Sequence, residues 1–390
     1  MPLPEIDSHY LREQLEKLLS IPSPTGYTDT VVRYVSEELE RLGVPYSVTR
    51  RGAILALYRG AEVEGARAIV SHLDTLGATV KMIKDNGRLE LVPIGTWSAR
   101  AAEYTRCTLF TDQGSFRGTI LPLKASGHTF NTEVDTQPVG WPHIEVRIDA
   151  DCYDRKSTEA LGVNIGDTVA IDPGAEFLDN GYIVSRHLDD KAGCAVALAA
   201  LKAMVDAKVA TPVDIHFIFT ITEEVGSGAS AVLLDNVVAM VSIDNGTTAP
   251  GQNSSEFGVT IGMADQVGPF DYFLTRKLIR LCEENNIRHQ RDVFRYYRSD
   301  SASALEGGAD VRTALITFGI DASHGYERIH MHALKSLAEL TVLYASSEVE
   351  IRRDVEELTG LDGFTEQPTE PAPHSEIDPA DHDGPPAYGE

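Results

Sequence analysis

The sequence predicts an α/β domain that is interrupted by a β-rich insertion. Helix and strand patterns alternate up to about residue 76 and again after about residue 176. Between them, residues 77–175 contain short β-rich segments separated by turn residues, without long helical periodicity. Strands at such regular spacing are typical of a small β-barrel or sandwich. Acidic residues and histidines follow several of the predicted strands, which is where ligands bind to α/β sheets.

Two amphipathic helices are predicted before the first strands. Leucines recur at helical spacing over 8–20, and the segment IPSPTG at 21–26 ends this helix because proline lacks an amide donor. A second helix over 28–42 ends at Gly43, a residue type that suits a left-handed C-cap. Further helices are predicted over 190–206, 270–286 and 332–356, and strands over 53–58, 66–72, 214–221, 238–244 and 313–319.

Composition and charge exclude several classes of function. The chain has 34 basic and 59 acidic residues and a formal charge of −25, which argues against a nucleic-acid partner and a polybasic membrane surface. No apolar run approaches the roughly 20 residues that span a bilayer. Four widely spaced cysteines argue against a disulfide framework and fit a reducing cytoplasm. Residues 366–390 contain six prolines, seven acids and no Lys or Arg, so we expect a disordered acidic tail.

Potential metal ligands lie at the ends of the predicted strands and the starts of the following helices. They are His72 and Asp74, Asp189 and Asp190, Glu223 and Glu224, Asp244, and His330. Taken singly, such residues are usually surface pairs or helix caps. Burial of two adjacent glutamates is costly without a cation, however, and two divalent metals account for the whole set. Imidazole and carboxylate ligands suit Zn²⁺, Co²⁺ or Mn²⁺, so the spacing predicts a dinuclear hydrolase.

Six blocks of sequence closely resemble the M42 aminopeptidases and occur in that family's order. They are SHLDTLG (71–77), NGRLELVPIG (86–95), HLDDKAGCAVAL (187–198), TITEEVGSGA (220–229), SIDNG (242–246) and ERIH (327–330). The resemblance implies a mixed-sheet dinuclear-metallopeptidase domain, formed by 1–76 and 176–358. A small β-barrel-like dimerisation domain at 77–175 interrupts it, and homo-oligomers from dimer up to dodecamer are built through that insertion. Residues 292–330 resemble a branch associated with the osmoprotectant N-acetylglutaminylglutamine amide.

The resemblance also implies a role for each candidate residue. His72 and Asp244 would bind one metal, with Asp74 orienting the histidine from behind. Asp189 would bridge both metals, and its peptide bond to Asp190 would be cis. The remaining three roles fall to Glu223 as general base and to Glu224 and His330 as ligands of the second metal.

Two parts of the site stay open at the sequence level. The family commonly has Tyr-Ile-His-Ser-Pro around the last ligand, whereas this chain offers His324, His330 and His332. Motif register and the helix that follows favour His330. Arg298 and Asp300, in the polar run YRSDSAS, either line a specificity pocket or belong to an ordinary surface loop.

We therefore expect a cytoplasmic metallo-aminopeptidase that hydrolyses short peptides, and the resemblance of residues 292–330 implies a link to the osmoprotectant. One alternative is a deacylase or amidase that cleaves an N-acetylated glutaminyl dipeptide at the same metals, and another is a non-catalytic oligomeric scaffold. A dinucleotide enzyme is a further rival, since Gly226, Gly228 and Ala231 fit the glycine-rich pattern. The adjacent glutamates would then point negative charge at a pyrophosphate, which disfavours it.

Overall fold

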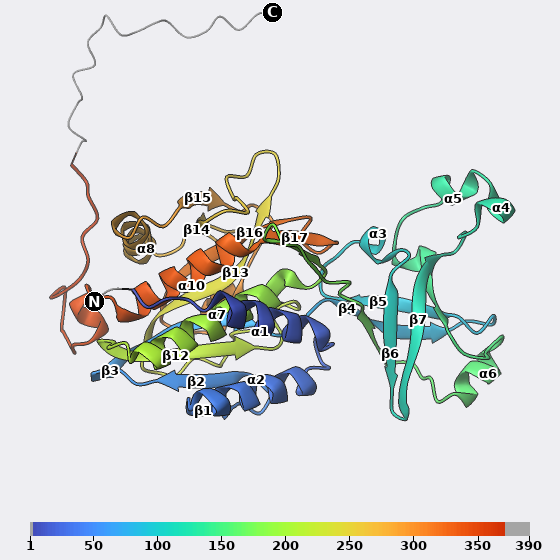
Figure 1. Cartoon of the computed structure of the whole chain (residues 1–390), viewed down its shortest axis with the longest axis horizontal. Coiled ribbons are helices and arrows are strands. Elements are labelled where there is room, and N and C mark those ends of the chain that lie inside the picture. The colour runs from blue at the N-terminus through green and yellow to red at the C-terminus, as the bar shows by residue number, and fades with distance from the viewer. Residues whose placement is uncertain (1–2, 371–390) are drawn as a thin grey trace, which may run out of the picture. The chain divides into compact units, whose positions relative to one another are not determined.

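The computed structural model describes residues 3–370, and the predicted acidic tail lies outside the described residues from 371 onward. The chain divides into two compact units, Met1–Val349 and Glu350–Glu390. In the second unit, the described part contains one 3₁₀ turn, Arg352–Asp354. The first unit holds a large mixed sheet and a closed barrel, so the predicted α/β fold with a barrel-like insertion is confirmed (Figure 1).

Eleven strands of the described residues form the large sheet, and its centre is parallel. The main order is β1 (Tyr46–Val48), β2 (Ile54–Tyr58), β12 (Val213–Thr220), β3 (Glu62–His72), β13 (Val237–Thr248), β16 (Arg312–Asp321), β17 (Glu327–His330), β11 (Tyr182–Ser185) and β10 (Glu176–Phe177). A side branch adds β14 (Val259–Ala264) and β15 (His289–Val293). Every residue of β12 is buried, including Asp214 and His216, as expected of a strand that is covered on both faces.

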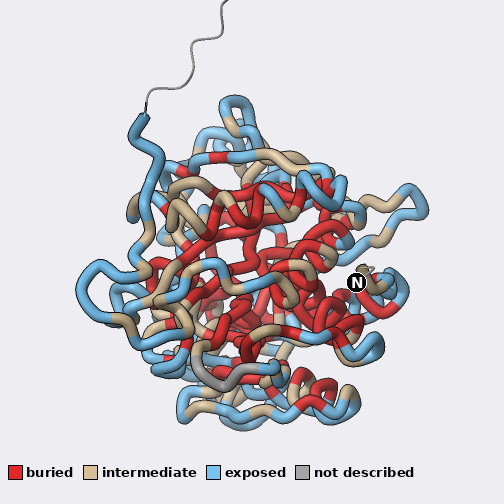
Figure 2. Tube along the Cα trace, turned by 90° about the vertical axis from the view of Figure 1, so that its left-hand side faces the viewer, coloured by how far each residue is buried: buried red, intermediate tan, exposed pale blue. Residues whose placement is uncertain are grey.

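Three helices lie across one face of this sheet, namely α1 (Ser8–Ser20), α7 (Leu188–Ala207) and α10 (Met331–Ser346) (Figure 1). The remaining longer helices are α2 (Asp29–Leu42) beside β2 and α8 (Tyr272–Glu284) beside α10. Helix α9 (Asp300–Glu306) packs on β13 and β16, where Ala304 joins an apolar cluster with Val70 and Met240. Buried residues accordingly concentrate in the interior, around the sheet and the helices packed on it (Figure 2).

The last long helix is shorter than predicted. The pattern predicts a helix to residue 356, but α10 ends at Ser346 and Ser347 is extended. The guanidinium of Arg67, on β3, donates to the carbonyl oxygens of Tyr344 at 2.7 Å and Ser347 at 2.8 Å. These carbonyls at the helix end are therefore satisfied by a side chain almost 280 residues away in sequence, which local periodicity cannot reveal.

The insertion is a closed six-stranded barrel within the described residues. Its order is β4 (Gly77–Ile83), β5 (Leu89–Ile94), β8 (Ile144–Ile148), β7 (Gly114–Pro122), β6 (Arg106–Thr111) and β9 (Thr168–Ile171). Short helices not predicted from the sequence join these strands: α3 (Ala99–Ala102), α4 (Gly127–Phe130), α5 (Glu133–Thr136), a 3₁₀ turn (Trp141–His143) and α6 (Arg155–Ala160).

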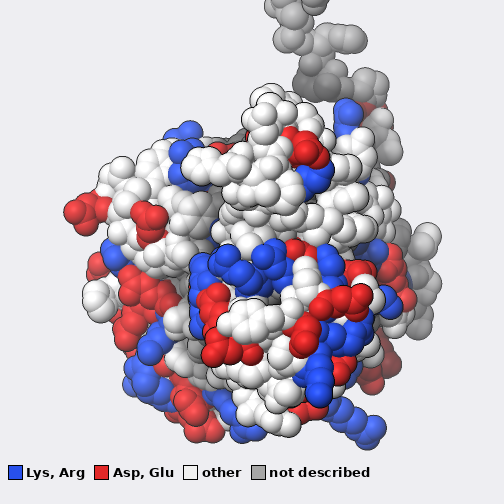
Figure 3. All heavy atoms as spheres, turned by 90° about the vertical axis from the view of Figure 1, so that its right-hand side faces the viewer, with Lys and Arg blue, Asp and Glu red and all other residues white. Residues whose placement is uncertain are grey.

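The barrel and the α/β part contact each other through aromatic and polar side chains. Tyr27 stacks on Phe110 of the barrel with ring centroids 4.5 Å apart, and the Arg186 guanidinium donates to the carbonyl oxygen of Ala101 in the insertion at 3.2 Å. On the face that includes the barrel, basic and acidic side chains lie side by side (Figure 3). Among the described residues, no helix combines the length and apolarity needed to cross a bilayer.

Candidate active site

The strand register brings the predicted ligands to one edge of the sheet. His72 at the end of β3 is level with Thr220, the last residue of β12, and Glu223 follows three residues later. Ser242 of β13 pairs with Val70, which places Asp244 level with His72. These positions share the carboxyl edge of the parallel strands, as expected from the sequence.

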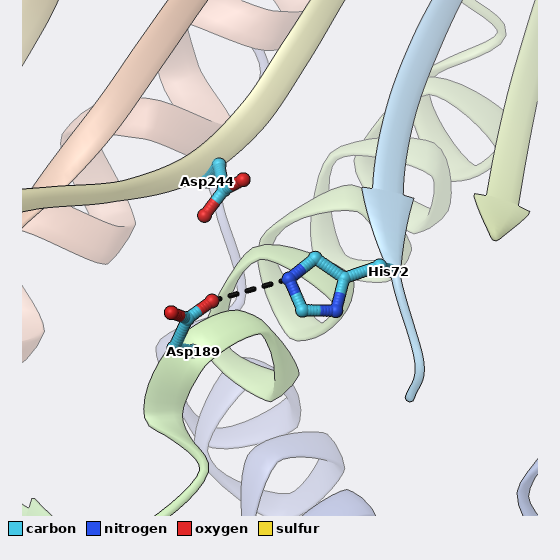
Figure 4. A group of neighbouring side chains, drawn as sticks. All are labelled: His72, Asp189 and Asp244. Carbon is cyan, nitrogen blue, oxygen red and sulfur yellow. Dashed lines mark hydrogen bonds and ion pairs between the residues drawn. The ribbon is translucent and has the colours of Figure 1, made fainter. Parts of the chain in front are cut away.

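The first group of potential ligands consists of His72, Asp189 and Asp244 (Figure 4). All three are buried and point toward one another, with one donor atom of each within 4.8 Å of the others. The His72 Nδ1 lies 3.0 Å from the carbonyl oxygen of Asp74, and a carbonyl can only accept. The Nδ1 therefore carries the proton, and in the neutral ring Nε2 is free to ligate on the side where Asp189 Oδ1 lies, at 3.1 Å.

The second group consists of Asp189, Glu224 and His324. The His324 Nε2 lies 3.1 Å from Asp189 Oδ2 and 3.7 Å from Glu224 Oε2. Its Nδ1 is 2.8 Å from the carbonyl oxygen of Thr96, which fixes this ring as it fixes His72. Asp189 thus turns one carboxylate oxygen toward each imidazole, the arrangement expected of a bridging ligand.

The sequence favoured His330 as the second imidazole, but the structure places His324, and not His330, in the second group of potential ligands. Its Nε2 faces the carbonyl oxygen of Asn180 at 3.1 Å, and its Nδ1 accepts the amide of His332 at 3.0 Å as the N-cap of α10. The ring packs 4.6 Å from that of Phe257. Because both ring nitrogens have backbone partners, His330 serves the start of a helix, and His324 takes the position beside Asp189.

Asp74 connects the histidine to the pair of glutamates. Its carboxylate accepts the amides of Glu223 at 3.1 Å and Glu224 at 3.3 Å, and the hydroxyl of Thr25 at 2.6 Å. The Glu223 carboxylate lies 3.8 Å from His72 Nε2 and lines the neighbouring cavity. Asp74 therefore sets both the turn that carries the glutamates and, through its carbonyl, the ring of His72.

Two functional neighbours escaped the sequence analysis. The buried carboxylate of Glu327 accepts the amides of Leu188 at 2.8 Å, Asp189 at 3.3 Å and His324 at 2.9 Å. The side-chain amide of Asn245 donates from Nδ2 to Asp189 Oδ2 at 2.7 Å. Both residues lie inside the blocks ERIH and SIDNG, so a polar residue next to a predicted ligand was the available signal.

The buried charges of the site suit a bound cation. The Asp189–Asp190 peptide bond is cis, as predicted. Burial and neighbouring carboxylates raise the pKa values of Glu223 and Glu224 well above the usual range and that of Asp244 to about 7. The Oε1 atom of Glu224 is buried and has no hydrogen-bond partner among the described residues. Carboxylates that repel one another, together with an unsatisfied buried oxygen, are the donor set that divalent cations stabilise.

A cavity of about 650 Å³ opens beside the two groups. Its lining includes Glu223, Asp244 and His324, together with Gln266, Tyr296, Tyr297 and Arg298. Arg298 is thus a cavity residue that also pairs with Glu306. Asp300 is buried and accepts the Thr220 hydroxyl at 2.6 Å, so it supports the end of β12 and does not line the cavity.

An α/β sheet with two groups of carboxylates and imidazoles at its carboxyl edge defines a metallohydrolase-like architecture. The family model described as M42 glutamyl aminopeptidase matches residues 52–340. A putative aminopeptidase of Bacillus subtilis, YhfE, is 35% identical over 86% of this chain and 97% of its own length. The chain therefore belongs to the M42 family of aminopeptidases, and as a member it is a metal-dependent hydrolase.

More distant relatives and solved structures agree with this assignment. The glutamyl aminopeptidase of Lactococcus lactis is 26% identical over 55% of this chain and 60% of its own. The Pyrococcus horikoshii TET1 peptidase, which can assemble into a tetrahedron or a large octahedral shell, superposes with a TM-score of 0.76. At 23% identity it covers 86% of this chain and 99% of its own, and it shows the shared fold.

Proposed function

We propose that this chain is a dinuclear metal-dependent aminopeptidase that removes N-terminal residues from short peptides. The observation that carries the proposal is the position of Asp189 between two imidazoles, with Glu224 and Asp244 completing two groups of three potential ligands. His72, Asp189 and Asp244 would hold one ion, and Asp189, Glu224 and His324 the other. Zn²⁺ or Co²⁺ suits these ligands best, and Mn²⁺ is a third candidate.

Bound divalent ions would polarise the scissile carbonyl and make an attacking water more acidic. Glu223 is the general base in this proposal, since its carboxylate lines the cavity beside His72 and belongs to neither group of ligands. It takes the proton from the water and returns it to the leaving amine. Asp74 fixes the backbone of Glu223 and the tautomer of His72, so base and ligand keep their relative positions.

The cavity supports a small peptide substrate. Its volume of about 650 Å³ falls in the range of small-molecule sites. Its acidic residues would attract a positively charged N-terminus, and Tyr296, Tyr297 and Arg298 line the same cavity. These three residues belong to the stretch 292–330 that resembles the osmoprotectant-associated branch, so a glutaminyl dipeptide is the first substrate to test.

The proposal includes a cytoplasmic homo-oligomer built through the barrel at 77–175, with the catalytic residues outside it. Four unpaired cysteines fit a reducing compartment. The assembly of the TET1 peptidase, a relative of the same fold, supports self-association.

The test is hydrolysis of glutaminyl-glutamine amide in the presence of Zn²⁺ or Co²⁺, with and without an N-acetyl group. Cleavage of the free-amine form alone is the expected result. Cleavage of the acetylated form alone would overturn the aminopeptidase proposal in favour of a deacylase or amidase. No hydrolysis of these or other short peptides by metal-loaded protein would support a non-catalytic scaffold.

A further inference from the structure

The Tyr297 hydroxyl is a buried donor without a hydrogen-bond partner among the described residues. The residue lines the cavity together with Asp244. A tyrosine hydroxyl normally finds a partner when it is buried, because an unsatisfied polar group there costs free energy. This hydroxyl therefore needs an explanation that the residues of the proposed mechanism do not supply.

The tyrosine ring is held firmly on its other side. Its centroid lies 5.2 Å from that of Phe294, and the ring packs on the cluster of Phe270, Phe294 and Leu315. The Tyr297 carbonyl accepts the amide of Gln266 at 3.1 Å. A ring fixed at its base can hold a hydroxyl at one position without further loss of side-chain entropy.

Tyr297 and Asp244 line the same cavity, and after burial the Asp244 carboxylate contributes most to raising the pKa of the Tyr297 hydroxyl. One oxygen of Asp244, Oδ1, accepts the backbone amide of Asn245 at 2.6 Å and its side-chain amide at 3.2 Å. The other oxygen, Oδ2, accepts no hydrogen bond from a described residue. An unsatisfied donor thus lies near a ligand carboxylate of which only one oxygen is fixed.

We propose that Tyr297 is a positioning residue whose hydroxyl holds the Asp244 carboxylate in place for the metal bound by His72, Asp189 and Asp244. This inference rests on the proposed dinuclear centre and adds to it a difference between the two sites. Partners behind a ligand typically change metal affinity by about 10- to 100-fold. Glu224 and His324 belong to the other group, so their metal should be insensitive to Tyr297.

The experiment is a titration of the metal-stripped full chain with Co²⁺, followed by calorimetry and visible absorption. Tyr297→Phe keeps the ring and removes the hydroxyl, and we expect it to weaken one of two binding events by about 10- to 100-fold. Tyr296→Phe is the matched control, because this neighbour lines the same cavity but is 93% exposed. It should leave both events unchanged.

Further outcomes distinguish a failure of the role assigned to Tyr297 from a failure of the proposed dinuclear centre. Adding Tyr297→Phe to Asp244→Asn should cause no additional loss of affinity, since the two side chains act as one unit. Wild-type affinity in Tyr297→Phe, or equal weakening of both events, would overturn the inference while two bound ions still support the dinuclear centre. A wild-type chain that binds no Co²⁺ would overturn both.

Discussion

At the scale of single residues, His324 and His330 differ in what their ring nitrogens face. His324 Nε2 faces two carboxylates, whereas both nitrogens of His330 have backbone partners. We therefore expect His324→Ala to lose one of two bound metals and almost all peptidase activity. His330→Ala should retain both metals and lose only some stability as a helix cap. Metal content by mass spectrometry and dipeptide hydrolysis show which histidine is the ligand. Loss of a metal and of activity in His330→Ala, but not in His324→Ala, would assign the ligand role to His330.

Glu223 provides a second test at this scale. Glu223→Gln keeps the size of the side chain but removes the base, so turnover should fall by at least the ~10²-fold typical of a lost acid–base group. Metal content and thermal unfolding should stay as in the wild type, because Glu223 belongs to neither ligand group. Activity near the wild-type level would exclude Glu223 as the base.

Most site residues could be predicted because they follow strands in sequence, and the rest depend on tertiary contacts. His72, Glu223 and Asp244 lie at strand ends that periodicity locates. His324 also follows a strand, β16, by three residues, but motif register and the helix that follows favoured His330. Tyr297 could not be singled out from the sequence, because the argument for it depends on a buried hydroxyl without a partner and on the cavity that it shares with Asp244.

At the scale of elements, the start of α1 offers a clean test of local stability. The Asp7 carboxylate accepts the amides of His9 at 3.1 Å and Tyr10 at 3.0 Å. Asp7→Ala should lower the free energy of unfolding by about 1 kcal/mol without changing catalysis. Glu16→Ala, at an exposed site on the same helix, is the control and should have a much smaller effect.

The same helix cap predicts how the stability contribution of Asp7 changes with pH. The Tyr10 amide lowers the pKa of Asp7 below its usual value of 3.8. A carboxylate with a lowered folded-state pKa stabilises the fold above the unfolded value and loses this contribution as the pH falls through the lowered one. The gap between wild type and Asp7→Ala in urea unfolding should therefore shrink below about pH 4. A gap that widens in acid would contradict this account of the cap.

Helices and strands were predictable where one of their faces is apolar. They were less predictable where residues distant in sequence determine where the element ends or with what it pairs. The bounds of α1 agree with the leucine pattern, and α2 ends at Gly43 with a positive φ of 70°. The end of α10 depends on Arg67 of β3. The short strands β10, β11 and β17 lie next to one another, and β17 joins them to the sheet through β16. They contain too few residues for periodicity to show.

At the scale of the whole molecule, our proposal assigns self-association to the barrel and catalysis to the α/β part. Light scattering on the purified chain should give a mass several times 42.5 kDa if the barrel builds a homo-oligomer. A mass of one chain over a wide range of concentrations would contradict the proposed self-association. The active-site assignment would stand, because both ligand groups come from a single chain.

The most direct test of the central claim is the metal requirement of activity. The metal-stripped chain is titrated with Zn²⁺ or Co²⁺ while hydrolysis of a dipeptide amide with a free N-terminus is followed. Our account predicts two ions per chain and activity that develops fully only when both ligand groups, joined by Asp189, are filled. Full activity in the stripped protein, or saturation at one ion per chain, would contradict the dinuclear centre.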